Sequence, residues 1–522
     1  MKLLSSNIDK INSCFENRKK CFEKEIKTES PYNDHVYEEL ELEDYISNKC
    51  DTLTNSGKQK LREMLHETVE RIPYEHVQKN IEFLKEKLTQ FKELEEVLVF
   101  FSENNSSDLN ALLGNTKFTF PLFTKLNKNK GAISALNMYY LINPFFSIIS
   151  PIVLFVLTYL FSRFFFYKYI KMMAFSVPQL DLFKRGMLRG FFTLFMFIYS
   201  LYSSSILSYI NYNLFKKEYE YIRSYLEIHR IISEIKEKLG LDWDISTSVK
   251  INTKFFHNNY SFFNDKGEIQ FCFNEINSDK DNTNRLLEYF GILDAQVYLC
   301  EQINNSKMCL ATEIENDTPK IVLEEFYSPL LDGGVPSSLT LDGEDAIIVA
   351  PNAQGKSTFL RAVGCCLLLA QQWGVVPAKK MEFTRFTNID TYINVTDESG
   401  QKSLFQAEIN RIKNYLTKLK DSPPDSFSFI IIDEILSSTN PKDGESASMA
   451  IAEKLRDYKN AIALISSHHH RLVELEDYRK FTLHDYTLKE EVNLTTNALD
   501  LMDIDDDIKR RAKEIKDSSV ST

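Results

Sequence analysis

Residues 346–358 read Ala-Ile-Ile-Val-Ala-Pro-Asn-Ala-Gln-Gly-Lys-Ser-Thr, and this stretch decides the fold of the C-terminal part of the chain. Its first four residues are an apolar run typical of a short buried strand, and a helical run follows at 359–369. A loop that joins a strand to a helix and ends in Gly-Lys-Ser-Thr is typical of a phosphate-binding loop. Its backbone N–H groups and the helix N-terminus attract phosphate oxygens. The stretch therefore predicts binding of ATP with Mg²⁺.

Each position of this loop has an expected role. Lys356 would neutralise phosphate oxygens, and the hydroxyl of Ser357 would ligate Mg²⁺. Ala350 stands where the usual pattern has its first glycine, and its methyl group costs more if φ is positive than if φ is negative. The candidate nucleotide-binding residues are Ala350, Pro351, Asn352, Ala353, Gln354, Gly355, Lys356, Ser357 and Thr358.

A second apolar run, at 427–432, ends in two carboxylates, Asp433 and Glu434. A continuous apolar run is typical of a buried parallel strand. At the end of such a strand Asp433 would hold Mg²⁺, and Glu434 would orient or deprotonate an attacking water. The alternative is a pair of surface acids that happen to follow a core strand.

A third apolar run, at 461–466, is followed by Ser467 and by three histidines at 468–470. A polar side chain at the end of this strand could reach the γ-phosphate, and His468 is the candidate. A surface histidine cluster is the alternative. Three adjacent histidines diverge from one another, so we do not expect them to bind a metal.

These three elements, in this order, resemble the MutS family of mismatch-repair ATPases. The residues at 350–358 are similar to the family's G-P-N-x-x-G-K-S-T. Residues 374–378 resemble its G-x-x-V-P-A, and residues 399–408 resemble its S-G-x-S-T-F-x-x-E-M with one extra residue. Further similar segments are Asp433-Glu434 with Thr439 and Asp443-Gly444, Ser467-His468, Asp51–Gly57, Leu293-Asp294, Tyr327–Pro329 and Asn497–Leu499.

The resemblance implies an α/β P-loop ATPase domain of the ABC type, with a mostly parallel sheet, joined to an all-α lever and core domain. It also implies a homodimer or a MutS-like heterodimer in which Ser403 reaches the partner's γ-phosphate. DNA is a further partner that the resemblance allows. Two departures, at Ala350 and at 436–438 where the family has Gly-Arg-Gly, would affect rate and coupling more than binding. The family's mismatch-reading domain has no room before residue 36.

Two apolar blocks, 141–161 and 191–210, contain no charged residue. About 20 apolar residues in a helix span a hydrocarbon core of roughly 30 Å. The blocks therefore predict a transmembrane hairpin at 140–210, inserted in the lever, with the ATPase domain facing the cytosol or nucleoplasm. A pair of buried core helices is the alternative, and the charges that flank the blocks leave the topology of the hairpin open.

Composition sets the remaining limits. The net charge of −12 means that any nucleic-acid contact needs a local basic patch, and the eight cysteines show neither metal-ligand spacing nor a disulfide framework. The expected domains are an N-terminal helical extension at 1–35, the two halves of the lever and core at 36–130 and 216–318, the membrane hairpin at 131–215, the ATPase at 319–490, and a helical dimerisation element with a tail at 491–522.

The functional hypothesis is a membrane-anchored, MutS-like ATPase that acts on DNA or on a DNA-bound partner, in mismatch-repair-like or recombination-related processes. One alternative is a membrane mechanochemical ATPase that no longer binds nucleic acid. Another is the nucleotide-binding half of an ABC transporter, which is disfavoured because no Leu-Ser-Gly-Gly-Gln is present. A scaffold that binds ATP without hydrolysing it is the last alternative.

Overall fold

The chain divides into two compact units, each described by itself. Unit 1 includes Lys85–Phe290, and unit 2 comprises Glu25–Leu84 and Gly291–Thr522. The computed structural model describes residues 31–67, 72–102, 129–136, 138–139, 177–246, 251–261, 264–350, 354–393, 404–423, 425–436, 439–467, 470–484 and 487–490, with positions 126, 142, 149, 153, 156, 160 and 511.

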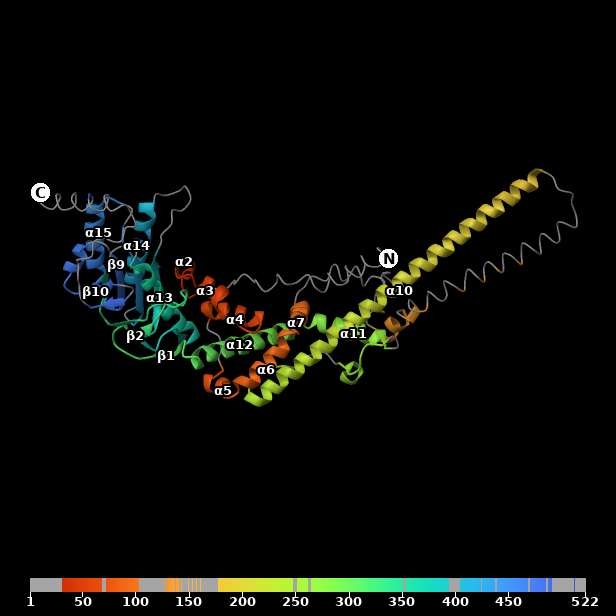
Figure 1. Ribbon diagram of the computed structural model, residues 1–522, viewed down its shortest axis with the longest axis horizontal. Helices are drawn as coiled ribbons and strands as arrows, with labels where there is room; N and C mark the ends of the chain where they lie inside the picture. The colour runs from red at the N-terminus through yellow and green to blue at the C-terminus, as the bar shows by residue number, and fades with distance from the viewer. Residues whose placement is uncertain are drawn as a thin grey trace. The chain divides into compact units, whose positions relative to one another are not determined.

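Unit 1 is helical in its described residues (Figure 1). Its core is aromatic: Phe91 and Phe290 stack with ring centroids 3.7 Å apart, and Phe101 packs edge-on against Tyr225. Two helices, α6 and α12, have residues in both units. The elements of unit 1 are α6 (Ile81–Lys92), α7 (Glu95–Ser102), α10 (Val177–Leu239), η2 (Thr253–Phe256), α11 (Lys266–Ser278) and α12 (Lys280–Asn304).

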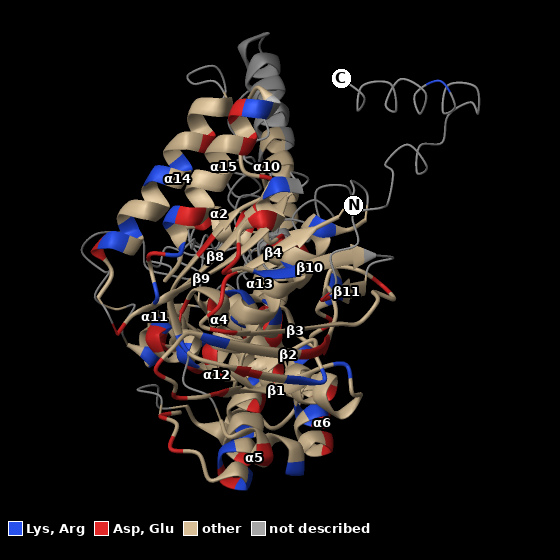
Figure 2. Cartoon of the chain, turned by 90° about the vertical axis from the view of Figure 1, so that its left-hand side faces the viewer, with Lys and Arg blue, Asp and Glu red and all other residues tan. Residues whose placement is uncertain are grey.

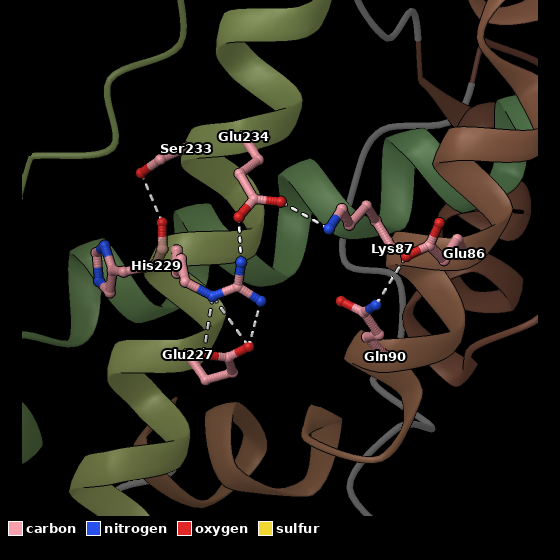
Figure 3. A network of polar contacts seen from close by, with 8 residues as sticks. Glu86, Lys87, Gln90, Glu227, His229, Ser233 and Glu234 are labelled. Atoms are coloured by element: carbon pink, nitrogen blue, oxygen red, sulfur yellow. Dashed lines mark hydrogen bonds and ion pairs between the residues drawn. The ribbon is translucent and has the colours of Figure 1, made fainter. Parts of the chain in front are cut away.

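A network of charged side chains connects α6 to α10 (Figure 3). The Nζ of Lys87 lies 2.6 Å from a carboxylate oxygen of Glu234, and Arg230 pairs with both Glu234 and Glu227. The Lys87 side chain is 10% exposed, whereas the Arg230 side chain is 49% exposed. Since exposed ion pairs are worth little, the Lys87–Glu234 pair is the contact of this network that stabilises the packing of α6 on α10.

The second apolar block, 191–210, is not a separate span but part of the 63-residue helix α10. No proline or glycine lies at 211–216, so the helix continues into the charged residues at 216–239, whose apolar side is buried in unit 1. The block at 141–161 lies largely outside the described residues. Among the helices that the described residues form, none is long and apolar enough to cross a bilayer. The prediction of a transmembrane hairpin at 140–210, and with it the membrane localisation, is therefore wrong.

Unit 2 combines short N-terminal helices with two β-sheets and the helices that cover them. The helices are α2 (Asp34–Glu39), α3 (Leu42–Lys49), α4 (Asn55–His66), α5 (Tyr74–Lys79), α13 (Lys356–Trp373), α14 (Leu404–Asp421), α15 (Pro441–Leu455) and η3 (His470–Glu474). The strands are β1 (Cys309–Glu313), β2 (Lys320–Phe326), β3 (Ser337–Asp342), β4 (Ala346–Val349), β5 (Val375–Val376), β6 (Lys380–Phe383), β7 (Phe386–Tyr392), β8 (Phe427–Asp433), β9 (Ala461–Ser467), β10 (Arg479–His484) and β11 (Thr487–Lys489).

A six-stranded sheet forms the centre of unit 2, in the order β11-β10-β4-β9-β8-β7. Its pairs are parallel except for β10 with β11. Successive residues of each strand point to opposite faces, so Ile348 and Ile431 pack with α13 and the N-terminal helices. Ile347 and Ile430 pack on the other face with α14 and α15. Because both faces are covered, these strands read as continuous apolar runs.

A second sheet, in the order β3-β2-β6-β1-β5, was not predicted. It is mixed: β1 and β6 are parallel, whereas its other pairs are antiparallel. The expected fold class, a mostly parallel sheet joined to a helical domain with an inserted membrane hairpin, is therefore wrong: unit 2 holds a second, mixed sheet, and no helix of the described residues can cross a membrane. β1 and β3 carry exposed residues between buried or half-buried ones, and β5 and β6 have only two and four residues, so these strands lack the continuous apolar runs that identify β8 and β9.

Two segments that are far apart in the sequence, residues 53–57 and Asp294, form a buried polar junction. Asp294 is fully buried on α12, and its carboxylate accepts hydrogen bonds from the backbone N–H of Thr54 at 2.6 Å and of Leu53 at 3.1 Å. The Thr54 hydroxyl also donates to Asp294 and accepts from the Gly57 N–H, which makes Thr54 the N-cap of α4. Asp294 therefore fixes the start of α4 on α12.

Gly57→Ala should destabilise unit 2 because a Cβ at Gly57 would lie 2.2 Å from Oδ2 of Asp294 and 2.8 Å from its Cβ. The short Asp294 side chain cannot move away without losing its buried hydrogen bonds, so we expect a loss of about 2–4 kcal/mol. Chemical denaturation measures this loss. Gly190→Ala on α10 is the matched control, since nothing lies within 4 Å of its Cβ position. The control should be unchanged or up to about 1 kcal/mol more stable. Equal effects of the two substitutions would contradict the clash.

The structure also predicts a pH-dependent contribution from Asp345, which lies just before β4 and accepts a 2.7 Å hydrogen bond from the Ala463 N–H. Burial raises the pKa of Asp345 to about 6. Folding therefore disfavours the ionised form, so this group lowers stability as pH rises from about 4 to about 6, and the cost persists above that range. Asp345→Asn keeps an acceptor oxygen without the charge. The free energy of unfolding of this variant should exceed that of wild type by up to about 3 kcal/mol at pH 7.5 and should equal it at pH 3.5. Denaturant titration at the two pH values measures the difference.

The control for Asp345 is Asp342→Asn, which should have the opposite sign. A hydrogen bond from Lys320, at 2.6 Å, holds the pKa of Asp342 below its ordinary value. Its stabilising contribution is present at neutral pH and is lost as pH falls through the folded-state pKa. Asp342→Asn should thus lower stability at pH 7.5. A destabilising effect of Asp345→Asn at pH 7.5 would overturn the assignment of a buried, unfavourable charge.

Candidate functional site

The parallel strands of the six-stranded sheet bring several polar residues to one edge. Val349 of β4 pairs with Ser467 of β9, and Asp433 of β8 pairs with Ser466 of β9. The carboxyl ends of β4, β9 and β8 therefore lie side by side. In open α/β sheets, this edge is where ligands bind.

The loop after β4 leads into α13. Ala350 is 3% exposed and packs in the main core, and it is not among the residues with positive φ. A methyl group at this position, in place of the usual glycine, is therefore accommodated without backbone strain. Gly355 has φ of +83°, a conformation in which a Cβ is unfavourable, and it directly precedes the first residue of α13.

Lys356 is the first residue of α13 and is buried, with 6% exposure. Its Nζ donates a 2.9 Å hydrogen bond to the carbonyl oxygen of Ala350 and lies 3.0 Å from Oε1 of Glu434. A buried ammonium at the N-terminus of a helix is unfavourable without such oxygens, since the helix dipole is positive there. The Ala350 carbonyl and the Glu434 carboxylate offset that cost and hold Lys356 over the edge of the sheet.

Asp433 connects α13 to the sheet. One of its carboxylate oxygens accepts a hydrogen bond from the Ser357 hydroxyl, and the other accepts one from the Ser466 hydroxyl. Its side chain is thus held between the residue after Lys356 and the neighbouring strand. A serine hydroxyl and a carboxylate are both oxygen ligands of the kind that Mg²⁺ prefers, so this pair fits the predicted magnesium site.

Glu434 follows Asp433 in a left-handed backbone conformation, with φ of +53°. Its N–H donates to the Ser466 carbonyl at 3.2 Å, which fixes the turn. Leu436 also has a positive φ, +54°, and its side chain is 2% exposed. Positive φ is uncommon for residues other than glycine, asparagine and aspartate, and it persists only where the surroundings enforce it. Here the turn directs Glu434 back toward Lys356.

The structure thus brings together Lys356, Ser357, Asp433 and Glu434, which come from two segments about 75 positions apart. Thr358 lies on the first turn of α13, and Gln354 lies just before it. Pro351, Asn352, Ala353, Ser403 and His468 lie outside the described residues. Sequence reasoning missed Ser466, although the parallel alignment of two apolar runs that end in Asp433 and Ser466 was a signal for their pairing.

Comparisons with known proteins find similarity over the C-terminal part of the chain. Residues 346–508 match the protein family described as MutS domain V. The chain is 35% identical over 146 residues to the DNA mismatch repair protein MutS of Alkaliphilus metalliredigens, which covers 27% of this chain and 16% of that protein. It is 28% identical over 222 residues to the MutS of Acetivibrio thermocellus, covering 37% of this chain and 25% of that protein.

A further relative is the DNA mismatch repair protein MutS 2 of Halobacterium salinarum, 32% identical over 143 residues. The chain spans a quarter or less of the length of each of these three relatives. The likeness therefore concerns the MutS domain V segment, and the activities of the whole relatives do not follow from it.

Glu434→Gln should increase the affinity for a nucleotide. The substitution keeps the size of the side chain but removes the carboxylate that competes with phosphate oxygens for Lys356. We expect about 3- to 10-fold tighter binding of a non-hydrolysable, fluorescent ATP analogue, the equivalent of about 1 kcal/mol. Fluorescence titration in Mg²⁺ measures the change. Glu453→Gln, at an exposed carboxylate on α15, should bind as wild type does. Unchanged or weaker binding by Glu434→Gln would show that the ion pair does not oppose the nucleotide.

Proposed function

We propose that unit 2 binds ATP with Mg²⁺ and hydrolyses it to ADP and phosphate. The observation that supports this most is the cluster of Lys356, Ser357, Asp433 and Glu434 at the carboxyl ends of β4 and β8. A lysine at a helix N-terminus next to a serine–aspartate pair and a second carboxylate is the set of groups that phosphoryl transfer to water needs. The match of residues 346–508 to MutS domain V agrees with it.

In this proposal, the bound ATP replaces Glu434 as a partner of Lys356. The ammonium leaves the Glu434 carboxylate and contacts oxygens of the terminal phosphates, while the N–H groups at the start of α13 face the same phosphates. The Ser357 hydroxyl and the Asp433 carboxylate would hold Mg²⁺, which neutralises charge on the phosphate oxygens. The Ser466 hydroxyl keeps Asp433 in place.

Release of Glu434 from Lys356 prepares the hydrolytic step. The Glu434 carboxylate, released from Lys356, accepts a proton from a water molecule whose oxygen forms a bond to the γ-phosphorus, while the bond from that phosphorus to the ADP oxygen breaks. The same carboxylate therefore has two states, paired with Lys356 before binding and available as a base afterwards. Glu434 can therefore act as a general base only when the nucleotide is bound.

The remaining sites of the proposal come from the resemblance. Pro351, Asn352 and Ala353 would complete the loop around the phosphates, and His468 would contact the γ-phosphate. Ser403 would reach the γ-phosphate bound by a partner, in a homodimer or a MutS-like heterodimer. Two active sites would then form only in the dimer.

We also propose that the chain acts on DNA or on a DNA-bound partner, in a mismatch-repair-like or recombination-related process. The names of the relatives, DNA mismatch repair proteins, support this part. Figure 2 shows Lys and Arg interspersed with Asp and Glu on α14 and α15, so we do not assign the DNA contact to these helices. A DNA-bound protein as the partner agrees with the net charge of −12.

The proposal predicts a Mg²⁺-dependent ATPase that is lost in Lys356→Ala. Removal of the ammonium should weaken binding of the fluorescent ATP analogue by at least about tenfold, because a charge-assisted contact to phosphate is lost. Phosphate release should fall to background. Lys413→Ala, at an exposed lysine on α14, serves as the matched control and should keep wild-type turnover.

The same assay tests the DNA part when it is repeated with fully paired and with mismatched duplexes at several salt concentrations. A change in turnover that weakens as salt rises supports contact with DNA. Turnover that ignores every duplex, with ATPase otherwise intact, would reduce the proposal to an ATPase without nucleic acid. Wild-type protein that releases no phosphate, or Lys356→Ala with wild-type affinity, would overturn the ATPase itself.

A further inference from the structure

The junction between α2 and α3 lies directly against the helix that begins with Lys356. Leu40 is fully buried, and a Cβ at Gly364 of α13 would lie 2.6 Å from one of its methyl carbons, so Gly364 allows a close approach. The Cys365 thiol lies 3.4 Å from the Leu40 carbonyl oxygen. This N-terminal segment, more than 300 positions away in the sequence, is therefore packed on α13.

Within this junction, Glu39 contacts three different elements of unit 2. Its carbonyl oxygen accepts a 2.9 Å hydrogen bond from Nε of Arg361 on α13. One carboxylate oxygen accepts a 2.7 Å hydrogen bond from the N–H of Ile393, the residue after β7. The other lies 3.0 Å from Nη2 of Arg411 on α14. The Glu39 side chain is 9% exposed.

These contacts lie close to the proposed ATP site in the fold. Tyr392, the last residue of β7, pairs with Ile432, the residue before Asp433. Ile393 therefore lies at the same edge of the sheet as the acidic pair. Arg361 lies five positions after Lys356, on the helix that holds the phosphate-binding residues. Glu39 thus bridges the helix on which Lys356 lies and the strand next to Asp433 and Glu434.

The environment of Glu39 indicates that the bridge is specific. Burial raises the pKa of this carboxyl group, and the Ile393 N–H and Arg411 act in the opposite direction. A buried carboxylate is costly without donors, and each of its oxygens has one here. The neighbouring Glu38 is exposed, as expected for an ordinary surface glutamate on a short helix.

We infer that Glu39 is a positioning residue of the ATP site, which sets the distance between α13 and the carboxyl end of β7 through Arg361, Ile393 and Arg411. The inference rests on the proposed ATPase function. Through Glu39, the N-terminal segment determines how Lys356 and Ser357 face Asp433 and Glu434. Binding of phosphate depends mainly on the loop before α13, whereas hydrolysis depends on the alignment of both sides.

Substitution of Glu39 should therefore lower the rate of hydrolysis while nucleotide affinity is retained. A merely structural role would change both. Glu39→Ala should lower kcat by about tenfold or more, because small displacements of reacting groups are costly. Affinity for the fluorescent ATP analogue should stay within about twofold of wild type, since Lys356 and its loop are intact. Glu39→Gln should have an intermediate kcat, because its amide oxygen can still accept from Ile393 while the charge on Arg411 is no longer paired.

The experiment compares wild type, Glu39→Ala, Glu39→Gln and the matched control Glu38→Ala, all as the full chain. Steady-state phosphate release gives kcat and KM, titration gives the nucleotide affinity, and thermal unfolding gives the melting temperature. The inference is supported if kcat falls in the order wild type, Gln, Ala at a temperature well below every unfolding transition, with affinity retained. Glu38→Ala should behave as wild type.

Two results would overturn it: wild-type kcat in both Glu39 variants, or a parallel loss of affinity, kcat and melting temperature. If Glu39→Ala does not fold, Glu39→Gln decides between the same outcomes. Failure of the proposed function has a different signature, because wild type would then release no phosphate. If wild type hydrolyses ATP and Lys356→Ala does not, the ATPase proposal stands even when the Glu39 variants show that Glu39 has no role.

Discussion

The arrangement of the site depends on the parallel register of β4, β9 and β8. With Asp433 opposite Ser466, and Ser467 opposite Val349, the segment that leads to Lys356 and the acidic pair leave the sheet at the same edge. A shift of one residue in β8 would exchange the two faces of the strand and would turn Asp433 away from Ser357. The apolar side chains that alternate between the two cores fix the register, so the packing of the sheet also determines the chemistry at its edge.

The second constraint is the burial of Lys356 at the start of α13. An ammonium in this place needs oxygen partners, and the structure supplies a backbone carbonyl at 2.9 Å and a carboxylate at 3.0 Å. Of these two partners, the Glu434 carboxylate can leave by rotation of its side chain, whereas the Ala350 carbonyl is part of the main chain. The site is therefore assembled around a positive charge that is already in place, and in the proposed function a phosphate would displace the Glu434 side chain from it.

The parts of the fold and of the site that could be predicted are those that a local sequence pattern encodes. β8 and β9 were predicted from sequence because each is a continuous apolar run that ends in a polar residue, and β4 because its apolar run precedes the Gly-Lys-Ser-Thr loop; the structure has all three at these positions. The second sheet was missed because β1 and β3 carry exposed residues between buried or half-buried ones, and because β5 and β6 have only two and four residues. The apolar part of α10 was assigned to a membrane because composition does not reveal that the helix continues for 63 residues. Glu39 could not be found at all, since its partner Ile393 is 354 positions away.

The N-terminal helices hold α13 at both of its ends, and this arrangement has a mechanical consequence. Near its start, Arg361 donates to the carbonyl of Glu39, and at its end the Trp373 indole N–H donates to the carbonyl of Leu61 on α4 at 3.2 Å. The start of α4 is in turn bonded to Asp294 of α12. Because packed interiors transmit strain, a displacement of α13 would be passed to α4, and with it to the attachment on α12. A chain of contacts from α13 through α4 to α12 therefore exists within unit 2 itself, and Asp294 is the residue at which it reaches α12.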